Sequence, residues 1–583
     1  MYAKCGFLQQ AQQVFDKLSV KNVVVWTTLI AGYAEYGYGD VAICHLDEMQ
    51  RHGVCPDGVT YICGLKSCGK IGATDKGQEL HTEVTTKGLE TDLILCSTLV
   101  DMYAKCGSLQ SAHAVYDKLT VPNIVACTAL IVGYTDHGFA LEALQCFKQM
   151  QSKRIPADAV TYVCSLKACG SIGATNEGYR LHAQILKEGM EADLLVCNTL
   201  IDMYAKSGAL FEARVVLVKI PSRNVVSWNA LIAGYVEHEY GVEALSCYKC
   251  MQIEGITPDD ATLSCTLKAC GITRNAQEGQ EIHSELIRRG LAIDTPVGNS
   301  LVDMYAKCGF LDKAREVFER IKGRDVVSWT ALITGYTEFG SFEEALYSFY
   351  QMQHEGVTPD ATTFLCTLKA CSGLAALDTG QEIHAEIAKT RIELDFVFGT
   401  SLVSMYAQCG WLEKAVEVFD NLTCHNVPLC NALLTGYAQL GEVEKVLCLT
   451  DQMITEGLPP NVATFASLFN ACSYAGLLHE AHVHFECMSK MFGIIPTLTH
   501  CNCIVDLLCR AGLVDMAAAL IQIMPFHPCA VVWHDVLGAC QRCRNVELGL
   551  QAFSHAFGLN EKDSAVYIST LNIFVMEEYL LSI

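Results

Sequence analysis

Two sets of small polar residues recur along this chain and offer hydrogen-bonding chemistry. One set contains only Thr, Ser and Asn, and the other contains only Asp and Asn. An ionised Asp only accepts hydrogen bonds, whereas Asn donates and accepts, so such pairs could sort ligands by donor and acceptor pattern. In chain order the pairs are Thr27 with Asp57, Ser97 with Asn123, Thr128 with Asp158, Asn198 with Asn224, Asn229 with Asp259, Asn299 with Asp325, Thr330 with Asp360, Thr400 with Asn426, and Asn431 with Asn461.

A long internal repeat carries these pairs. The phrases MYAKCG, MYAKCG, MYAKSG, MYAKCG and MYAQCG begin at Met1, Met102, Met203, Met304 and Met405, with a constant step of 101 residues. Phrases such as VSWNALI and LKAC keep the same step. Strict repetition of this kind is typical of a solenoid, in which stacked units build the functional surface.

Each block divides into three units of 35, 35 and 31 residues, for example Val225 to Asp259, Asp260 to Asp294, and Thr295 to Asp325. Apolar residues at helical spacing, followed by Gly and Pro, predict two antiparallel helices in each unit. We therefore predict an all-α fold, an α-solenoid that forms a right-handed superhelix of helix-turn-helix hairpins. The paired residues are the fifth and the last of their units, and we call these positions the fifth site and the last site. A purely structural interpretation is that they start helices and fill turns.

Composition limits the class of protein. The chain has 583 residues, is 51% hydrophobic and has a formal net charge of −23. No stretch approaches the roughly 18–20 apolar residues of a membrane span, so we expect no membrane association. The 31 cysteines include a repeat-locked set, which we expect to be buried thiols in a reducing compartment. The acidic charge argues against non-specific nucleic-acid binding.

The alternation of unit lengths and the repeated sequence motifs resemble those of the plant pentatricopeptide repeat family. The resemblance is to its PLS subclass and E-type, and it rests on VVSWNALIAGY, GITPD, LKAC, QEIHSE and LVDMYAKCGFLDKAREVF. On this basis residues 1–22 are a partial S unit, 23–426 are four P-L-S triplets, and 427–529 are a final triplet. Residues 530–563 resemble an E1 motif and 564–583 a truncated E2 motif, with no deaminase domain.

The family resemblance implies that each unit reads one base of single-stranded RNA. Asp at the last site suits guanine and uracil, which offer an imino N–H, and Asn suits adenine and cytosine. By the resemblance, Thr or Ser at the fifth site favours purines and Asn favours pyrimidines. The predicted RNA, from 5′ to 3′, is G-x-A-G-x-Y-U-x-U-G-x-A-Y-x-x. Asn502 with Cys529 departs from the pattern.

Lysines recur near these positions and suggest weak phosphate contacts, with ordinary solvated lysine as an equal alternative. They are Lys66, Lys167, Lys268 and Lys369 in the L units, and Lys105, Lys206 and Lys307 in the S units. His81, His283 and His384 begin HxE sequences like those of zinc deaminases, but they recur with the repeat and lack the second half of the motif. We interpret them as packing residues. We expect no enzyme activity, cofactor, metal or small-molecule substrate.

The resemblance implies a site-recognition factor for organellar C-to-U RNA editing, with a deaminase-carrying partner and accessory proteins acting in trans. An RNA stability or processing factor, and a tetratricopeptide-like protein-binding scaffold, are the alternatives. Mitochondrion or chloroplast is implied by the family alone, since no Arg/Ser-rich presequence precedes the first repeat.

Overall fold

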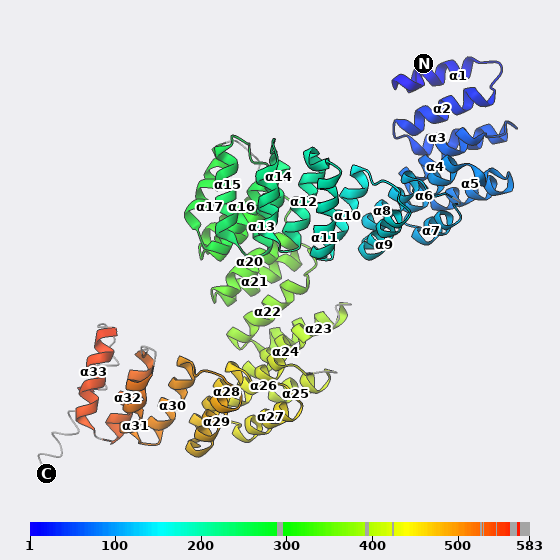
Figure 1. Cartoon of the computed structure of the whole chain (residues 1–583). Helices are drawn as coiled ribbons and strands as arrows, with labels where there is room; N and C mark the ends of the chain where they lie inside the picture. The colour runs from blue at the N-terminus through cyan, green and yellow to red at the C-terminus, as the bar shows by residue number, and fades with distance from the viewer. Residues whose placement is uncertain are drawn as a thin grey trace, which may run out of the picture. The chain divides into compact units, whose positions relative to one another are not determined.

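The computed structural model describes residues 1–119, 121–288, 295–390, 396–422, 425–524, 528, 530–543, 545–559, 568, 570 and 571. Within these residues the chain is all-helical, as predicted, and contains no strand. It forms two compact units, Met1–Met304 and Tyr305–Ile583. Figure 1 shows the helices following one another as hairpins.

The helices of the first unit alternate between a first and a second helix of each hairpin. In chain order they are η1 (Ala3–Cys5), α1 (Leu8–Lys17), α2 (Val23–Glu35), α3 (Gly39–Arg51), α4 (Gly58–Ile71), α5 (Thr74–Thr86), η2 (Leu89–Thr91), α6 (Leu93–Lys105), α7 (Leu109–Asp117), α8 (Ile124–Asp136), α9 (Ala140–Ser152), α10 (Ala159–Ser171), α11 (Thr175–Lys187), η3 (Met190–Ala192), α12 (Leu194–Lys206), α13 (Leu210–Lys219), α14 (Val225–Glu237), α15 (Gly241–Ile253), α16 (Asp260–Thr273), α17 (Ala276–Arg288) and α18 (Thr295–Lys307), the last of which continues past the division.

The second unit shows the same alternation of first and second helices. Its helices are α19 (Leu311–Arg320), α20 (Val326–Glu338), α21 (Phe342–His354), α22 (Ala361–Leu374), α23 (Leu377–Lys389), α24 (Phe396–Gln408), α25 (Leu412–Asp420), α26 (Val427–Gln439), α27 (Val443–Thr455), α28 (Val462–Ala475), α29 (Leu478–Lys490), α30 (Leu498–Arg510), α31 (Val514–Ile523), α32 (Ala530–Cys543) and α33 (Val546–Leu559). The predicted E2-like segment, 564–583, lies outside the described residues except at 568, 570 and 571.

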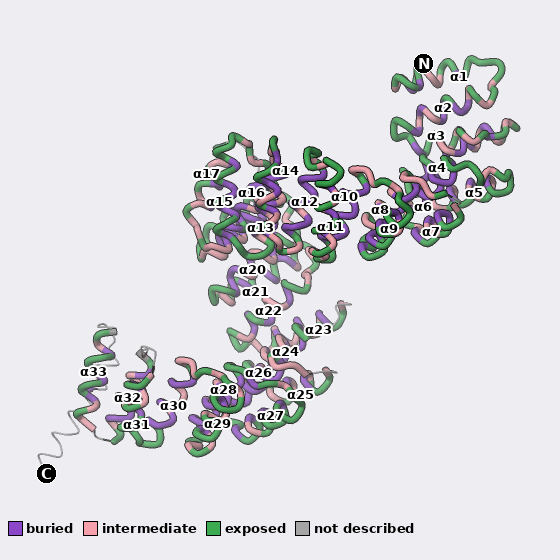
Figure 2. The backbone as a smooth tube through the Cα atoms, in the orientation of Figure 1, coloured by how far each residue is buried: buried purple, intermediate pink, exposed green. Residues whose placement is uncertain are grey.

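The first helices of the hairpins form a continuous inner layer within each unit. In the first unit α2, α4, α6, α8, α10, α12, α14 and α16 contact one another in order, and in the second unit α20, α22, α24, α26, α28, α30 and α32 do the same. A first helix therefore has neighbours on several sides. The first helix α12 buries nine residues, whereas the second helix α11 buries three. Figure 2 shows this difference along the tube.

The repeated phrase MYAKCG is explained by close packing of its Met and Ala side chains. A Cβ on Gly178 of α11 would lie 2.5 Å from Sδ of Met203, and a Cβ on Gly133 of α8 would lie 2.6 Å from Cβ of Ala104. Both distances are too short for a side chain. Glycine is therefore required where the S-unit first helix meets the hairpins before and after it.

One set of repeat-locked cysteines consists of buried thiols, as predicted, whereas a second set, Cys106, Cys308 and Cys409, is only half-buried. Cys68, Cys169, Cys270, Cys371 and Cys472 are all fully buried on first helices. Burial raises the pKa of the Cys169 thiol to about 12, so this side chain behaves as a small hydrophobe. No helix of the described residues has the length and apolar character needed to cross a bilayer.

Candidate functional site

The residue at each last site begins a helix. The Asp57 side chain caps α4, and its Oδ1 accepts a hydrogen bond from the backbone N–H of Thr60 at 2.8 Å. Asn123 caps α8 in the same way through the backbone N–H of Ala126, also at 2.8 Å. Asp and Asn are among the strongest N-cap residues because they satisfy a backbone donor that the helix itself leaves open. The last-site residues therefore do cap helices, and the capping hydrogen bond fixes the orientation of the side chain.

The residue at each fifth site lies one turn inside the preceding first helix, and several of these residues face the last site. Asn229 Nδ2 donates to Asp259 Oδ1 at 2.9 Å, and Asn431 Nδ2 donates to Asn461 Oδ1 at 3.0 Å. A third pair, Asn198 with Asn224, is joined by a direct bond of 3.4 Å. Ser97 Oγ lies 3.2 Å from Asn123 Oδ1, so this pair also meets. The structure thus brings together residues about 30 positions apart in sequence.

A third residue completes most of these pairs, and sequence reasoning missed it. It is the third residue of the following unit, which we call the third site. Thr161 illustrates its role: its hydroxyl donates to Asp158 Oδ1 at 2.6 Å and lies 2.7 Å from the Thr128 hydroxyl. Because the single Thr161 proton goes to the carboxylate, Thr128 is the donor to Thr161. Thr27 and Asp57 are joined in the same way through Thr60, at 2.6 and 2.7 Å.

The third-site threonines were visible in the sequence as another set with the 101-residue step. They are Thr60, Thr161, Thr262, Thr363 and Thr464. All five are fully buried, in contrast to the last-site residues beside them, which are exposed or half-buried. A threonine three residues after Asp or Asn is also a common helix-start signal, so its contact with the fifth site could not be read from the pattern.

Thr330 is joined to Asp360 in the same way through Thr363, whose hydroxyl lies 2.8 Å from that of Thr330; the Thr330 hydroxyl itself lies 3.5 Å from Asp360 Oδ1. Two other pairs differ from this arrangement. Thr400 donates to the carbonyl oxygen of Phe396 at 2.7 Å instead of to its predicted partner Asn426. Asn299 and Asp325 belong to different compact units, so their mutual position is not described. Cys529, the predicted partner of Asn502, lies outside the described residues.

The N-cap bond determines which atom of the last-site residue remains available. Oδ1 accepts from the helix backbone in every described case, so Asp keeps Oδ2, an acceptor, and Asn keeps Nδ2, a donor. Within the described part of the chain, Oδ2 of Asp158 and Nδ2 of Asn461 make no hydrogen bond. Burial acts to raise the pKa of Asp259, but hydrogen bonds from Thr262 and Asn229 outweigh it and lower that pKa below its usual value. The carboxylate is therefore ionised at neutral pH.

Aliphatic side chains flank the pairs. Val24 and Val59, the second residues of their units, line a cavity of about 300 Å³ together with Thr27 and Asp57. The equivalent side chains of Val125, Val226 and Val327 are 58%, 52% and 54% exposed, which is unusual for valine on a well-packed helix. A larger hollow of about 570 Å³ between α22 and α24 is lined by Leu365, Lys369, Val397 and Thr400. Each open site thus combines polar atoms with apolar walls.

The two groups of lysines behave differently. The L-unit lysines Lys66, Lys167, Lys268 and Lys369 are exposed and form no hydrogen bond or ion pair with any described residue. The S-unit lysines Lys105 and Lys206 instead bind Asp101 and Asp202 one turn earlier, at 2.7 and 2.8 Å. Lys307 is half-buried. Of the predicted phosphate-binding residues, the four L-unit lysines are therefore the better placed.

The histidines of the HxE sequences pack between helices. His81 and His384 each contact the tyrosine hydroxyl of the next MYAKCG or MYAQCG phrase, Tyr103 at 2.9 Å and Tyr406 at 2.8 Å. Burial lowers the pKa of His384, which favours the neutral ring. Across the described residues, no three His, Cys, Asp or Glu side chains come together as metal ligands do.

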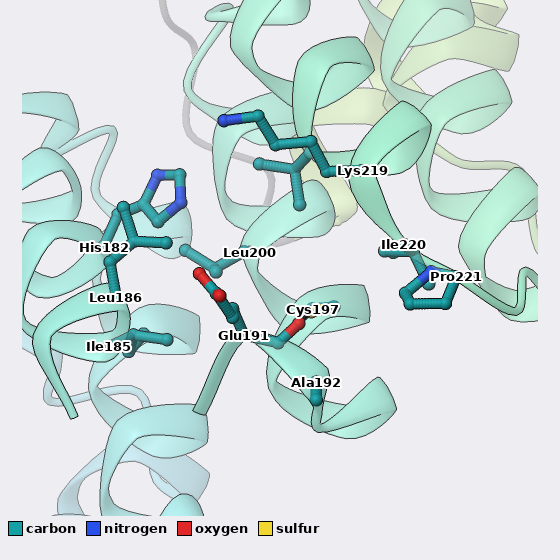
Figure 3. A pocket seen from close by; sticks show the side chains of 11 residues that line it. His182, Ile185, Leu186, Glu191, Ala192, Cys197, Leu200, Lys219, Ile220 and Pro221 are labelled. Atoms are coloured by element: carbon teal, nitrogen blue, oxygen red, sulfur yellow. Dashed lines mark hydrogen bonds between the residues drawn. The ribbon is translucent and has the colours of Figure 1, made fainter. Parts of the chain in front are cut away.

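The equivalent His182 borders a cavity of about 280 Å³ among α11, η3, α12 and α13. Figure 3 shows the lining side chains of His182, Glu191 and Lys219 with the apolar residues Leu200 and Ile220. His182 contacts the Tyr204 hydroxyl at 2.9 Å, so it is held like its counterparts in the other repeats.

Stacked helical hairpins, many of them carrying a polar pair, define an α-solenoid repeat protein. Comparisons with known proteins specify it further. A family model described as the PPR repeat family matches residues 21–70, 122–171, 223–271, 324–373 and 425–473, and a PPR repeat model matches 94–121, 195–225, 299–326, 400–427 and 499–528. The chain belongs to the pentatricopeptide repeat (PPR) family.

Curated relatives agree with this assignment, and a solved structure agrees with the fold. The chain is 34% identical over 575 residues to the pentatricopeptide repeat-containing protein At1g15510, chloroplastic, of Arabidopsis thaliana, spanning 98% of this chain and 66% of that protein. It is 30% identical over 583 residues to At2g03380, mitochondrial, of the same plant, spanning 99% and 84%. The crystal structure of PPR10 in complex with an 18-nt psaJ RNA element matches the fold with a TM-score of 0.55 and 20% identity, over 100% of this chain and 88% of that one.

Proposed function

We propose that this chain binds single-stranded RNA sequence-specifically, with each P or S unit reading one base through its fifth and last sites. The observation that carries the proposal is the pairing itself: two side chains from successive hairpins meet within hydrogen-bonding distance and keep unsatisfied atoms beside an open, apolar-walled site. A base has a flat apolar face and a polar edge, so such a site fits it. A relative of the same fold, PPR10, was crystallised with RNA.

The atom left free at the last site gives a physical reason for base choice. Asp158 offers an acceptor, which pairs with the imino N–H of guanine or uracil. Asn461 offers a donor, which pairs with the ring nitrogen acceptor of adenine or cytosine. This refines the sequence-based interpretation, in which Asn both donates and accepts, because the helix start already uses the Asn oxygen.

The net charge of −23 remains the main objection to RNA binding. Because a negative chain makes few contacts with phosphate, its affinity for RNA must depend on contacts with the bases. The four exposed L-unit lysines supply a modest positive contribution near the open sites. Binding of this kind is weak for unrelated RNA and strong only for a matching sequence.

We further propose that the repeats are of the PLS type and that the chain is an E-type site-recognition factor for organellar C-to-U editing, with the deaminase supplied by a partner. Support comes from the alternation of 35-, 35- and 31-residue units and from relatives whose names place them in chloroplasts and mitochondria. The helices α32 and α33, after the last S unit, fall in the proposed E1-like segment.

The proposal is tested by equilibrium binding to the predicted 15-nucleotide RNA and to a scrambled RNA of equal composition. We expect the predicted RNA to bind at least tenfold more tightly, since nine contacts at roughly 1–3 kcal/mol each exceed that difference even if most are weak. Equal affinity for both RNAs would rule out base reading. A separate assay, editing of a reporter transcript that carries the site in a plant line lacking this protein, tests the editing role.

A further inference from the structure

The third site is always Thr where the fifth site belongs to a P unit, and it varies with the fifth-site residue where that belongs to an S unit. Wherever the fifth site of a proposed reading pair is Asn, the third site carries a hydroxyl: the combinations are Asn198 with Ser227, Asn229 with Thr262, Asn299 with Ser328, and Asn431 with Thr464. The pairs whose third site lacks a hydroxyl have Ser97 or Thr400 at the fifth site, above Ala126 and Leu429 respectively. The unassigned S-unit residue Asn502, with Val532 three residues after Cys529, breaks this relationship and was already outside the predicted reading pairs.

The contacts explain why Asn needs the hydroxyl. Thr262 Oγ1 lies 2.6 Å from Asn229 Oδ1 and 2.8 Å from Asp259 Oδ1. Its single proton goes to Asn229, because Asp259 Oδ1 already accepts from Asn229 Nδ2 at 2.9 Å and from the backbone N–H of Thr262 at 2.8 Å. Asn431 is held in the same way by Thr464, at 2.7 Å. The amide oxygen is thus turned into the protein, and the second N–H of Nδ2 is left over.

The same arrangement occurs in an S unit with serine at the third site. Ser227 Oγ donates to Asn198 Oδ1 at 2.6 Å, and Asn198 Nδ2 lies 3.4 Å from Asn224 Oδ1. Both Ser227 and Thr262 are fully buried, so water does not replace them as donors to the amide oxygen. A buried amide oxygen that loses its donor is costly, and the side chain is expected to rotate out of the pair to reach solvent.

A hydroxyl at the fifth site has no such requirement. Ser97 donates to the carbonyl oxygen of Leu93 at 2.6 Å, and Thr400 donates to that of Phe396 at 2.7 Å. Each side chain satisfies its own proton on its own helix and keeps only lone pairs for a ligand. The third-site residue below can then be apolar.

We infer that the third-site hydroxyl is a positioning residue for fifth-site asparagine: it turns the Asn amide so that Nδ2 faces the base, and it thereby sets the preference for pyrimidines. The inference rests on the proposed RNA-binding function. Pyrimidines carry the acceptor O2 next to N3, whereas purines carry a hydrogen at the corresponding place, on C2 of adenine or on N2 of guanine. A fixed donor therefore favours pyrimidines, and a lone-pair acceptor favours purines.

The inference is tested with Thr262→Val and Thr262→Ser, measured by equilibrium binding to RNAs that differ only at the nucleotide assigned to Asn229. We expect Thr262→Val to reduce the preference for U over G by roughly fivefold or more, the lower bound for one base contact, and Thr262→Ser to retain it. The matched control is Thr161→Val, which removes the same helix-start hydroxyl beneath Thr128. Its preference for G should persist, because Thr128 can donate to its own helix as Ser97 does.

An unchanged preference in Thr262→Val overturns the inference, and so does an equal loss in Thr161→Val, which would indicate a general helix-start defect. Should Thr262→Val fail to fold, the converse experiment decides: Ser97→Asn is compared with the double variant Ser97→Asn, Ala126→Ser. The double variant should acquire a clear pyrimidine preference and the single variant should not. Wild-type protein that shows no preference at these nucleotides would instead refute the proposed function.

Discussion

Under the proposed base reading, we predict that replacing Asp158 by Asn changes the recognition chemistry of one unit while preserving the fold. Oδ1 of Asp158 accepts from both the backbone N–H and the hydroxyl of Thr161, at 2.8 and 2.6 Å. Asn supplies an equivalent oxygen and is as good an N-cap, so we expect the free energy of unfolding to change by less than about 0.5 kcal/mol. The outward atom, however, changes from the acceptor Oδ2 to the donor Nδ2.

The expected result is a switch from G to A at the nucleotide assigned to Thr128 and Asp158. Losing or gaining one base contact is worth about 1–3 kcal/mol, so the ratio of the affinities for A and G should move by roughly 5- to 150-fold. Fluorescence anisotropy with two RNAs that differ at this nucleotide measures the ratio. Removing one negative charge strengthens binding to both RNAs alike, and the ratio cancels that effect.

Asp158→Ala is the control for the helix start, because it removes the cap and should cost about 0.5–2 kcal/mol of stability without creating a preference for A. The reasoning is refuted if Asp158→Asn binds RNA normally but leaves the ratio of A to G affinity as in the wild type. That result would mean that the carboxylate serves the helix start alone.

Three further predictions concern packing, thiols and charge. Gly133→Ala should lower the free energy of unfolding by about 1–3 kcal/mol in urea, because its Cβ would lie 2.6 Å from that of Ala104, whereas Gly58→Ala, with no atom within 4 Å, should not destabilise the chain. Burial raises the pKa of Cys169 to about 12, whereas an unfolded thiol ionises near pH 8.5, so the unfolded state loses its proton first and the free energy of unfolding should fall as pH rises above about 8.5. In the native protein at pH 8, the exposed Cys250 should react with a thiol reagent and the buried Cys169 should not. Changing the four L-unit lysines to Ala should weaken binding to all RNAs alike and reduce the slope of log affinity against log salt by up to about one per lysine that contacts phosphate. Lys206→Ala is the control and should have a smaller effect, because the charge of Lys206 is paired with Asp202. An unaltered slope in the fourfold variant would exclude phosphate contact.

Much of this architecture follows from local rules that a sequence displays. The helical spacing of apolar residues and the repeated glycines predict hairpins, and the repeat register predicts buried thiols such as Cys169. The pairing of Asn229 with Asp259 was also predictable, because both positions vary in polarity within a nearly constant frame. These features depend on period and residue type alone.

Other features depend on side-chain direction, which the pattern does not contain. The bond from Thr400 to Phe396, in place of Asn426, is a choice of rotamer. The role of Thr262 is hidden because the same residue also serves the start of its helix, where its hydroxyl oxygen accepts from the backbone N–H of Asp259. The pairing of Lys206 with Asp202 could have been anticipated from their spacing of four residues on one helix.

The N-cap at each last site has a consequence for how such a protein changes over generations. Because Asp and Asn start the helix equally well, exchanging them leaves folding untouched, and one G-to-A transition in the codon is enough to make the exchange. Under the proposed base reading, a new specificity can therefore arise without passing through an unstable intermediate, and repeats of this kind can follow a changing target one nucleotide at a time.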